Sequence, residues 1–155
     1  MTVKIYTDGA CSGNPGVGGW AAVFALKDDI KVFSGNEPNT TNNRMELLAV
    51  IKAIEIAEKR KVEKAVIYSD SSYVVNAMTC GWLNLWKSKN WVNAKKEQVK
   101  NKDLWEYLDK LFRCVSVKVT FMKVKGHKGD PLNEIADKRA KEEVLKAKAK
   151  KGIRL

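Results

Sequence analysis

The order in which strand-like and helix-like segments follow one another constrains the fold of this chain more than any other feature. Short apolar or alternating stretches bounded by turns are expected to be strands, at 3–7, 20–26, 30–33, 65–68 and 115–121. Stretches without glycine or proline, with apolar residues at helical spacing, are expected to be helices, at 44–60, 72–78, 82–86, 101–112 and 133–150. The first three strands form a meander, and the later strands are reached through helices. This order predicts one five-stranded mixed sheet flanked by helices, an α/β fold.

Length and charge narrow the organisation and the partner. The 155 residues fit one domain, expected to span 1–145, and the basic, low-complexity tail at 146–155 is expected to fray. Lysine and arginine number 29 against 18 aspartates and glutamates, which gives a net charge of +11 and a pI near 9.6. A surplus of this size favours a polyanionic partner, either nucleic acid or an anionic membrane surface.

Several classes of protein do not fit the sequence. No apolar run approaches the roughly 20 residues that span a bilayer, and the N-terminal stretch reads as a strand rather than as a secretory signal. The three cysteines, Cys11, Cys80 and Cys114, are odd in number and widely spaced, which favours reduced thiols. We therefore expect a cytoplasmic protein without a membrane partner. The sequence contains neither the G-x-S-x-G motif of a nucleophilic serine nor the Gly-Lys-Ser/Thr motif of a phosphate-binding P-loop, which argues against both kinds of site.

Four carboxylates stand at positions where the expected fold can bring them together. Asp8 follows the first expected strand and Asp70 the fourth, while Glu46 and Asp137 lie near the starts of two helices. Ligand sites of α/β sheets gather at the carboxyl ends of strands, so Asp8 and Asp70 are candidates for one crevice. Clustered carboxylates are what a pair of Mg²⁺ ions requires, because the ions prefer hard oxygen ligands and offset the repulsion between the acids.

Each of these acids also has a structural interpretation, and the residues alone leave both open. Asp8 with the following glycine could form a turn, and Asp70 could cap the next helix. Glu46 lies three residues after Asn43, as the acid of a capping box would. Asp137 could pair with Lys141 one helical turn later.

The stretches that contain these acids resemble motifs of the type 1 ribonucleases H of bacteria, and the chain is identified as a similar protein. The motifs occur in order, at 6–11 with 13–16, 40–47, 68–71 with 73–74, 124–129 and 133–137. The resemblance runs from Val3 to about Glu143. It implies a ribonuclease H-like fold and a monomeric enzyme.

The resemblance also implies an activity and the roles of five residues. The implied reaction is hydrolysis of the RNA strand of an RNA–DNA hybrid, which leaves 5′-phosphate and 3′-hydroxyl ends. The metal-binding acids of the family fall on Asp8, Glu46, Asp70 and Asp137, which would hold two Mg²⁺ ions in the active complex, with Mn²⁺ as a substitute. The loop histidine of the family falls on His127, the only histidine here. It is expected to transfer protons during product release, whereas without the resemblance it would be interpreted as an exposed loop residue.

Substrate contacts are implied in the same way. Contacts with the RNA strand fall on Cys11, Asn14, Asn42 and Asn43, and Thr41 and Asn14 lie near a DNA phosphate. Ser72 stands where bacterial relatives commonly have a glutamine, so this contact is made by a shorter side chain.

Segment 82–100 resembles the family's basic protrusion and is given that name below. Five lysines stand against one glutamate between 87 and 100. The side chains expected near the substrate are Trp86, Lys87, Lys89, Trp91, Lys95 and Lys96. Trp82 and Trp105 are expected in the core. The basic tail has no role implied by the resemblance, and both a solvated helix and a non-specific nucleic-acid surface remain open for it.

Two rival functions remain beside the hybrid-cutting enzyme. One is a module that binds hybrids and retains the acids without cutting. The other is a nuclease of the same fold that acts on DNA junctions or on single ribonucleotides within DNA. Cleavage assays with a panel of substrates discriminate among the three.

Overall fold

The computed structural model describes residues 2–124 and 130–153. Within these residues the chain forms five strands and five helices. The strands are β1 (Thr2–Gly13), β2 (Gly16–Ala25), β3 (Ile30–Thr40), β4 (Lys64–Ser69) and β5 (Lys118–Lys123). The helices are α1 (Asn42–Lys59), α2 (Ser72–Thr79), α3 (Trp82–Ser88), α4 (Lys102–Cys114) and α5 (Pro131–Ile153).

The strands make one mixed sheet in the order β3-β2-β1-β4-β5. β1, β2 and β3 pair antiparallel as a meander, and β4 and β5 lie parallel to β1. The parallel neighbours β4 and β5 need a crossover connection, which α2, α3 and α4 provide. α1 connects the edge strand β3 to β4, which pairs on the far side of β1. The α/β fold with a five-stranded mixed sheet, as predicted, is confirmed.

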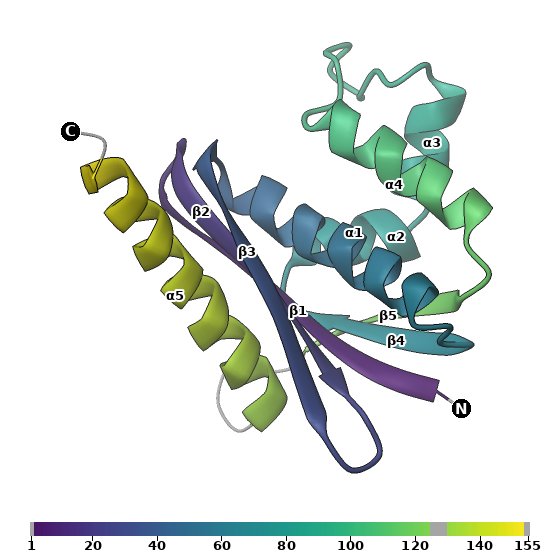
Figure 1. Ribbon diagram of the computed structural model, residues 1–155. Helices are drawn as coiled ribbons and strands as arrows, with labels where there is room; N and C mark the ends of the chain where they lie inside the picture. Colours follow the sequence, from purple (N-terminus) through teal and green to yellow (C-terminus); the bar gives the residue numbers. More distant parts are fainter. Residues whose placement is uncertain (1, 125–129, 154–155) are drawn as a thin grey trace.

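The helices cover both faces of the sheet. Figure 1 shows α5 alone on one face, with α1 and α2 on the other and α4 packed outside α1. The main core lies between the sheet and α1, whose inward face includes Leu47, Val50, Ile51 and Ile54. None of the helices in the described part of the chain is long and apolar enough to cross a membrane.

Two strands are longer than their apolar stretches. β1 continues past Asp8 to Gly13 because residues 9–13 pair with residues 16–20 of β2 in one hairpin. β3 continues through the polar residues after Phe33 to Thr40 because it pairs with β2 over most of its length. β3 is an edge strand, where polar side chains and a proline are tolerated. Hydrogen-bond pairing, which hydropathy does not report, sets both ends.

The end of the chain also differs from expectation. The last helix was expected at 133–150, with a tail from residue 146 that frays, and α5 instead runs from Pro131 to Ile153. Lysine and alanine are good helix formers, and no proline follows Pro131. Val144 and Ala147 pack against Val17 of β2, which fixes the helix beyond the point where the motifs end.

Candidate active site

The parallel register of β1 and β4 positions the two aspartates. The last paired residues are Tyr6 and Tyr68, whose rings stack at 4.7 Å between centroids. Asp8 and Asp70 each lie two residues beyond this pair, Asp8 still within β1 and Asp70 as the first residue after β4, so the parallel register brings them side by side. Asp8 lies within β1, not at its end, but it lies where the parallel ladder ends. The sequence therefore predicted correctly that the two acids lie close together, because both follow the end of the parallel pairing, although β1 itself extends beyond Asp8.

Glu46 reaches the aspartates because α1 approaches β1 at a glycine. An added Cβ on Gly9 would lie 2.4 Å from the backbone nitrogen of Glu46 and 2.5 Å from the carbonyl carbon of Met45. Such distances exclude any side chain, so only glycine permits this approach. Gly9 is thus a functional position that the sequence interpretation missed, because it treated Asp-Gly as a turn dipeptide.

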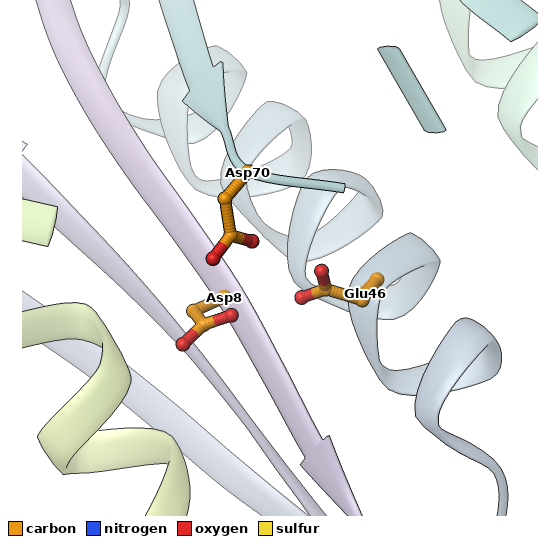
Figure 2. A group of neighbouring side chains, drawn as sticks. All are labelled: Asp8, Glu46 and Asp70. Carbon is orange, nitrogen blue, oxygen red and sulfur yellow. The ribbon is translucent and has the colours of Figure 1, made fainter. Parts of the chain in front are cut away.

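The carboxylates of Asp8, Glu46 and Asp70 converge, as Figure 2 shows, with one oxygen of each within 4.8 Å of the others. Burial raises the pKa of Asp8 to about 7, and the charge of Asp70 adds to the effect. Burial, together with the charges of Asp8 and Asp70, also raises the pKa of Glu46 well above its ordinary value. A cluster of this kind stores repulsion that a bound cation would relieve.

The donor set fits a divalent metal ion. Two of the three carboxylates are buried, and the Oε1 atom of Glu46 is buried without a hydrogen-bond partner. A buried carboxylate oxygen normally has a partner, so this atom is aimed at a group that the protein itself does not supply. Hard oxygen donors suit Mg²⁺ or Mn²⁺. The three carboxylates therefore form a candidate metal site.

Asp137 lies at the rim of the same site, on α5. It lines the same pocket as the other three acids, and its proximity contributes to the raised pKa of Asp8. Its own carboxylate pairs with Lys141 at 3.0 Å, as the structural interpretation expected. Asp137 is half-exposed and stands outside the three-carboxylate cluster, yet it approaches Asp8 closely enough to raise the pKa of Asp8 through a side-chain hydrogen bond and through its charge.

The structural interpretations of the other three acids do not fit. The N-cap of α2 is Ser71, not Asp70, and the N-cap of α1 is Thr41, whose side chain accepts from the backbone of Arg44. Glu46 is therefore too far along α1 to complete a capping box. Asp8 lies in a paired strand rather than a turn. His127 lies outside the described residues, and its role stays a prediction.

Several side chains expected to meet the substrate lie around the acids. An open pocket of about 510 Å³ is lined by the four acids together with Cys11, Asn42, Asn43, Ser72 and Lys141, among others. Thr41 precedes this group as the helix cap, and Asn14 is exposed in the turn between β1 and β2. The Nζ atom of Lys123 donates to the Ser72 hydroxyl, so a lysine from β5 reaches the position where the side chain is shorter than in bacterial relatives. Lys123 was not among the predicted site residues.

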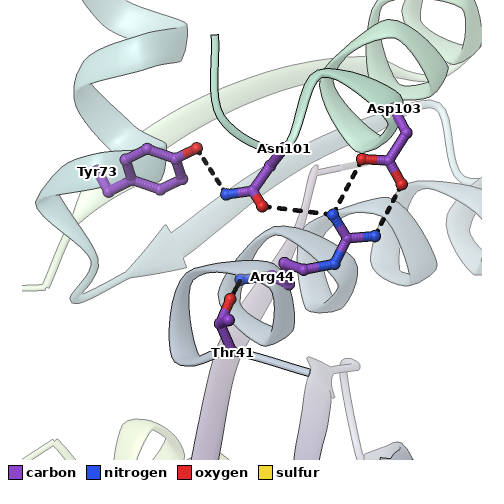
Figure 3. Close-up of polar contacts among 5 residues, drawn as sticks. All are labelled: Thr41, Arg44, Tyr73, Asn101 and Asp103. Atoms are coloured by element: carbon purple, nitrogen blue, oxygen red, sulfur yellow. Dashed lines mark hydrogen bonds and ion pairs between the residues drawn. The ribbon is translucent and has the colours of Figure 1, made fainter. Parts of the chain in front are cut away.

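A polar network fixes the start of α1 against the helices behind it (Figure 3). The guanidinium of Arg44 makes a bidentate ion pair with Asp103, at 2.9 and 2.7 Å, and donates to Asn101 at 3.3 Å. Asn101 in turn donates to the Tyr73 hydroxyl at 3.1 Å, which also accepts from the indole of Trp105 at 2.8 Å. Bidentate arginine–carboxylate pairs have strict geometry, so this network orients the turn of α1 that presents the predicted contacts.

The basic protrusion is assembled differently from expectation at its tryptophans. Trp105 is fully buried, as predicted. Trp86, expected near the substrate, packs its ring on Trp105 at 5.4 Å between centroids, whereas Trp82, expected in the core, is 37% exposed. The two stand four residues apart on α3, and hydropathy alone could not decide which of them faces inward.

The lysines of the basic protrusion also divide. Lys87 pairs with Asp109 of α4 at 3.0 Å, and Arg113 pairs with the same carboxylate at 3.2 Å, so one negative charge is shared between two cations. Lys89, Lys95 and Lys96 are exposed, and Trp91 is half-buried. The charge available to a partner therefore lies mainly in the second half of the segment.

Comparison with known proteins bears on this site. The family model of RNase H matches residues 1–145. A ribonuclease H of Thermoanaerobacter sp. is 51% identical over 142 residues, which cover 92% of this chain and 89% of that protein. A ribonuclease H of Bradyrhizobium sp. is 47% identical over 153 residues, or 98% of this chain and 96% of that protein.

Solved structures agree with these relatives. LC9-RNase H1, a type 1 RNase H with the type 2 active-site motif, has a TM-score of 0.76 and 30% identity, covering 94% of this chain and 73% of that one. LC11-RNase H1 in complex with an RNA/DNA hybrid has a TM-score of 0.73 and 23% identity, covering 94% and 98%. The latter likeness supports the fold.

Proposed function

The chain belongs to the ribonuclease H family, and on this premise we propose that it is a magnesium-dependent endonuclease that cuts the RNA strand of RNA–DNA hybrids. The products are 5′-phosphate and 3′-hydroxyl ends. The observation that supports this most directly is the convergence of Asp8, Glu46 and Asp70 within 4.8 Å in a chain matched by the family model over residues 1–145. The enzyme acts as a monomer in the cytoplasm.

In this proposal the metal ions are held by Asp8, Glu46, Asp70 and Asp137. The active complex takes two Mg²⁺, which Mn²⁺ can replace. When bound, such a pair supplies an activated water and stabilises the charge on the leaving 3′ oxygen. The orphaned Oε1 of Glu46 and the raised pKa of Asp8 support the acids as ligands, because both indicate missing positive charge.

The surrounding residues bind and orient the substrate. Cys11, Asn42 and Asn43, which line the pocket, contact the RNA strand, as does Asn14. Asn14 and Thr41 also lie near a DNA phosphate. Contacts of this kind read the 2′-hydroxyls and the backbone, so cleavage depends on the duplex type rather than on base sequence. His127 moves a proton during product release.

The RNA–DNA hybrid is the proposed partner for two reasons. LC11-RNase H1, of the same fold, has been solved with such a hybrid. The net charge of +11 suits a polyanion, and the exposed lysines of the basic protrusion lie on one segment. The basic protrusion contacts the hybrid through Lys89, Lys95, Lys96 and Trp91, with Trp86 and Lys87 behind them.

A cleavage assay tests the proposal. Hybrid duplex with labelled RNA is incubated with Mg²⁺, with Mn²⁺ and with a chelator, beside RNA–RNA and DNA–DNA duplexes and DNA containing a single ribonucleotide. We expect cutting of the hybrid RNA only, dependent on the metal. Tight hybrid binding without cutting would identify a binding module, and a preference for the single ribonucleotide would identify a different nuclease.

Asp8→Asn tests the site itself. The variant keeps the size of the side chain but removes a charge, so we expect turnover to fall about 10³-fold or more while hybrid affinity changes little. Asp28→Asn, in the exposed turn between β2 and β3, is the matched control and should cleave like the wild type. If Asp8→Asn retained most of its activity, Asp8 would not be a metal ligand.

A further inference from the structure

The second half of α5 runs past residue 145, where the family match ends, and the turns that lead into it are firmly seated on the sheet. An added Cβ on Gly19 of β2 would lie 2.4 Å from the carbonyl oxygen of Ala140, so the helix backbone lies directly on the strand. Glu143 is buried and accepts from Ser34 and Asn36 of β3 at 2.6 and 2.7 Å. These contacts fix α5 to two strands at once.

This seating brings the end of α5 beside the β1–β2 hairpin. Val144 and Ala147 pack with Val17 and Ala10, which belong to the two strands of that hairpin. Figure 1 shows the last turns of α5 beside the hairpin, on the opposite side of the molecule from α3 and α4. The hairpin contains Cys11 and Asn14, which are proposed to meet the substrate.

The lysines on this half of the helix are not equivalent. Lys146 lies 3.6 Å from the carboxylate of Glu143, and Lys150 donates to Asn36 at 3.4 Å. Lys148 and Lys151 are exposed, and no carboxylate of the described residues forms an ion pair with either of them. Their charges are available to a partner.

The position of these two lysines relative to the acids follows from helix geometry. Lys148 lies seven residues, or two turns, after Lys141, so both project from nearly the same face. Lys141 lines the pocket of the acids, which places Lys148 farther along the same edge. At about 1.5 Å per residue, Lys148 and Lys151 lie roughly 16 and 21 Å beyond Asp137 along α5. This corresponds to about five or six base pairs of a duplex at roughly 3.4 Å each.

We propose that Lys148 and Lys151 form a second phosphate-binding surface, which contacts the hybrid on the hairpin side of the cut, away from the basic protrusion. This inference rests on the proposed function, since it extends the footprint of the same duplex. Each phosphate neutralised by a lysine releases condensed counterions, so the contact adds affinity without adding sequence preference. The duplex is held at both ends of its footprint, with the acids between.

The experiment measures hybrid binding by fluorescence anisotropy as a function of salt, in the Asp8→Asn background so that the hybrid stays intact. Lys148→Gln/Lys151→Gln is compared with Lys27→Gln/Lys31→Gln, two exposed lysines in and after the turn between β2 and β3. For a hybrid of about 18 base pairs we expect the α5 double variant to bind roughly ten-fold more weakly. Its plot of log affinity against log salt should be shallower by about 1.8, or 0.9 per phosphate. The control should change neither value appreciably.

Equal effects of the two double variants would overturn the inference, because net charge alone would then explain the loss. So would unchanged hybrid binding by the α5 variant with loss of binding to phosphatidylserine vesicles, which would assign the lysines to a lipid surface. Failure of the wild-type chain to cut any hybrid would instead refute the proposed function, which separates the two outcomes.

Discussion

The carboxylate cluster and the basic protrusion are both proposed to meet the same duplex, yet the chain holds them in opposite ways. The acids come from β1, from α1 and from the residue directly after β4, in the middle of the molecule, and two of the three acids are buried. The basic protrusion consists of a seven-residue helix and an irregular loop, with Leu83 and Val99 as its fully buried apolar residues. The acids thus lie in the well-packed middle of the fold, and the exposed lysines lie on a segment with few buried residues.

The backbone shows the same difference. Four residues other than glycine adopt positive φ in or beside the basic protrusion: Asn90, Trp91, Lys96 and Asn101. The left-handed conformation costs such residues roughly 1–2 kcal/mol each, so this segment stores strain that the remaining contacts must offset. None of the three clustered acids has positive φ. We therefore expect substitutions around the carboxylate cluster to affect catalysis and substitutions in the basic protrusion to affect affinity for the hybrid.

After Asp8→Asn, the largest effect on activity is expected from Gly9→Ala, which tests the rigidity of the acid cluster. The new methyl group would displace the start of α1 and with it Glu46, and a shift of about 1 Å at a catalytic group can cost 10²-fold in rate. We expect kcat for hybrid cleavage to fall about 10²-fold. Gly152→Ala, where an added Cβ meets nothing within 4 Å, is the control and should retain full activity. A Gly9→Ala enzyme with normal kcat would show that the cluster tolerates movement.

A comparison of Trp105→Ala with Trp82→Ala distinguishes the buried tryptophan that supports the basic protrusion from the partly exposed one on its surface. Trp105 is fully buried, and its loss should lower the free energy of unfolding by about 3–5 kcal/mol. Trp82 is partly exposed, and its loss should cost less than about 1 kcal/mol. Urea denaturation followed by circular dichroism measures both. Equal losses would contradict the assignment of Trp86 and Trp105 as the inward pair.

The pH dependence of stability in the absence of metal reports on the acid cluster when the wild type is compared with Asp8→Asn. Burial raises the pKa of Asp8 to about 7, so between pH 4 and 7 the folded protein binds a proton that the unfolded chain does not. The free energy of unfolding should therefore decrease as the pH rises through this range, by on the order of 1–3 kcal/mol. Thermal melts across the range, with a chelator and then with Mg²⁺, measure this. Mg²⁺ should reduce the loss, and Asp8→Asn should flatten the chelated profile, whereas a chelated wild-type profile that rises toward pH 7 would contradict a raised pKa.

The smallest effect concerns the charges of the basic protrusion. Replacement of Lys89, Lys95 and Lys96 by glutamine removes uncompensated charge, so KM for hybrid should rise roughly ten-fold at moderate salt while kcat stays constant. Lys87→Gln removes a single charge, which shares the Asp109 carboxylate with Arg113, and should change KM by only about two-fold. Steady-state kinetics at several salt concentrations measure both. A triple variant with reduced kcat and unchanged KM would instead show that these lysines contribute to catalysis rather than to binding.

The contrast between the carboxylate cluster and the basic protrusion also explains how much of the structure the sequence could predict. The order of elements could be predicted because hydrophobic periodicity acts locally, and the convergence of the acids because the motifs mark the residues. The end of β1, the inward tryptophan of α3 and the packing of the end of α5 could not. Each depends on a partner distant in sequence: β2 for β1, Trp105 for Trp86, and Val17 for Ala147. Gly9 gave no separate signal, since its role is to leave space for a helix more than 30 residues away.

The register between β1 and β4 has a consequence for how such a chain tolerates insertions and deletions. Tyr6 faces Tyr68, and both aspartates are counted from that pair. A residue inserted between Ile67 and Asp70 would turn the aspartate to the opposite face of the sheet. A residue inserted in the turn after α1, at 60–63, would leave the count untouched and would lengthen only an exposed connection. Variation in length should therefore accumulate before β4 and be absent after its first pairs, so that gaps in related sequences mark the strand whose spacing the chemistry requires.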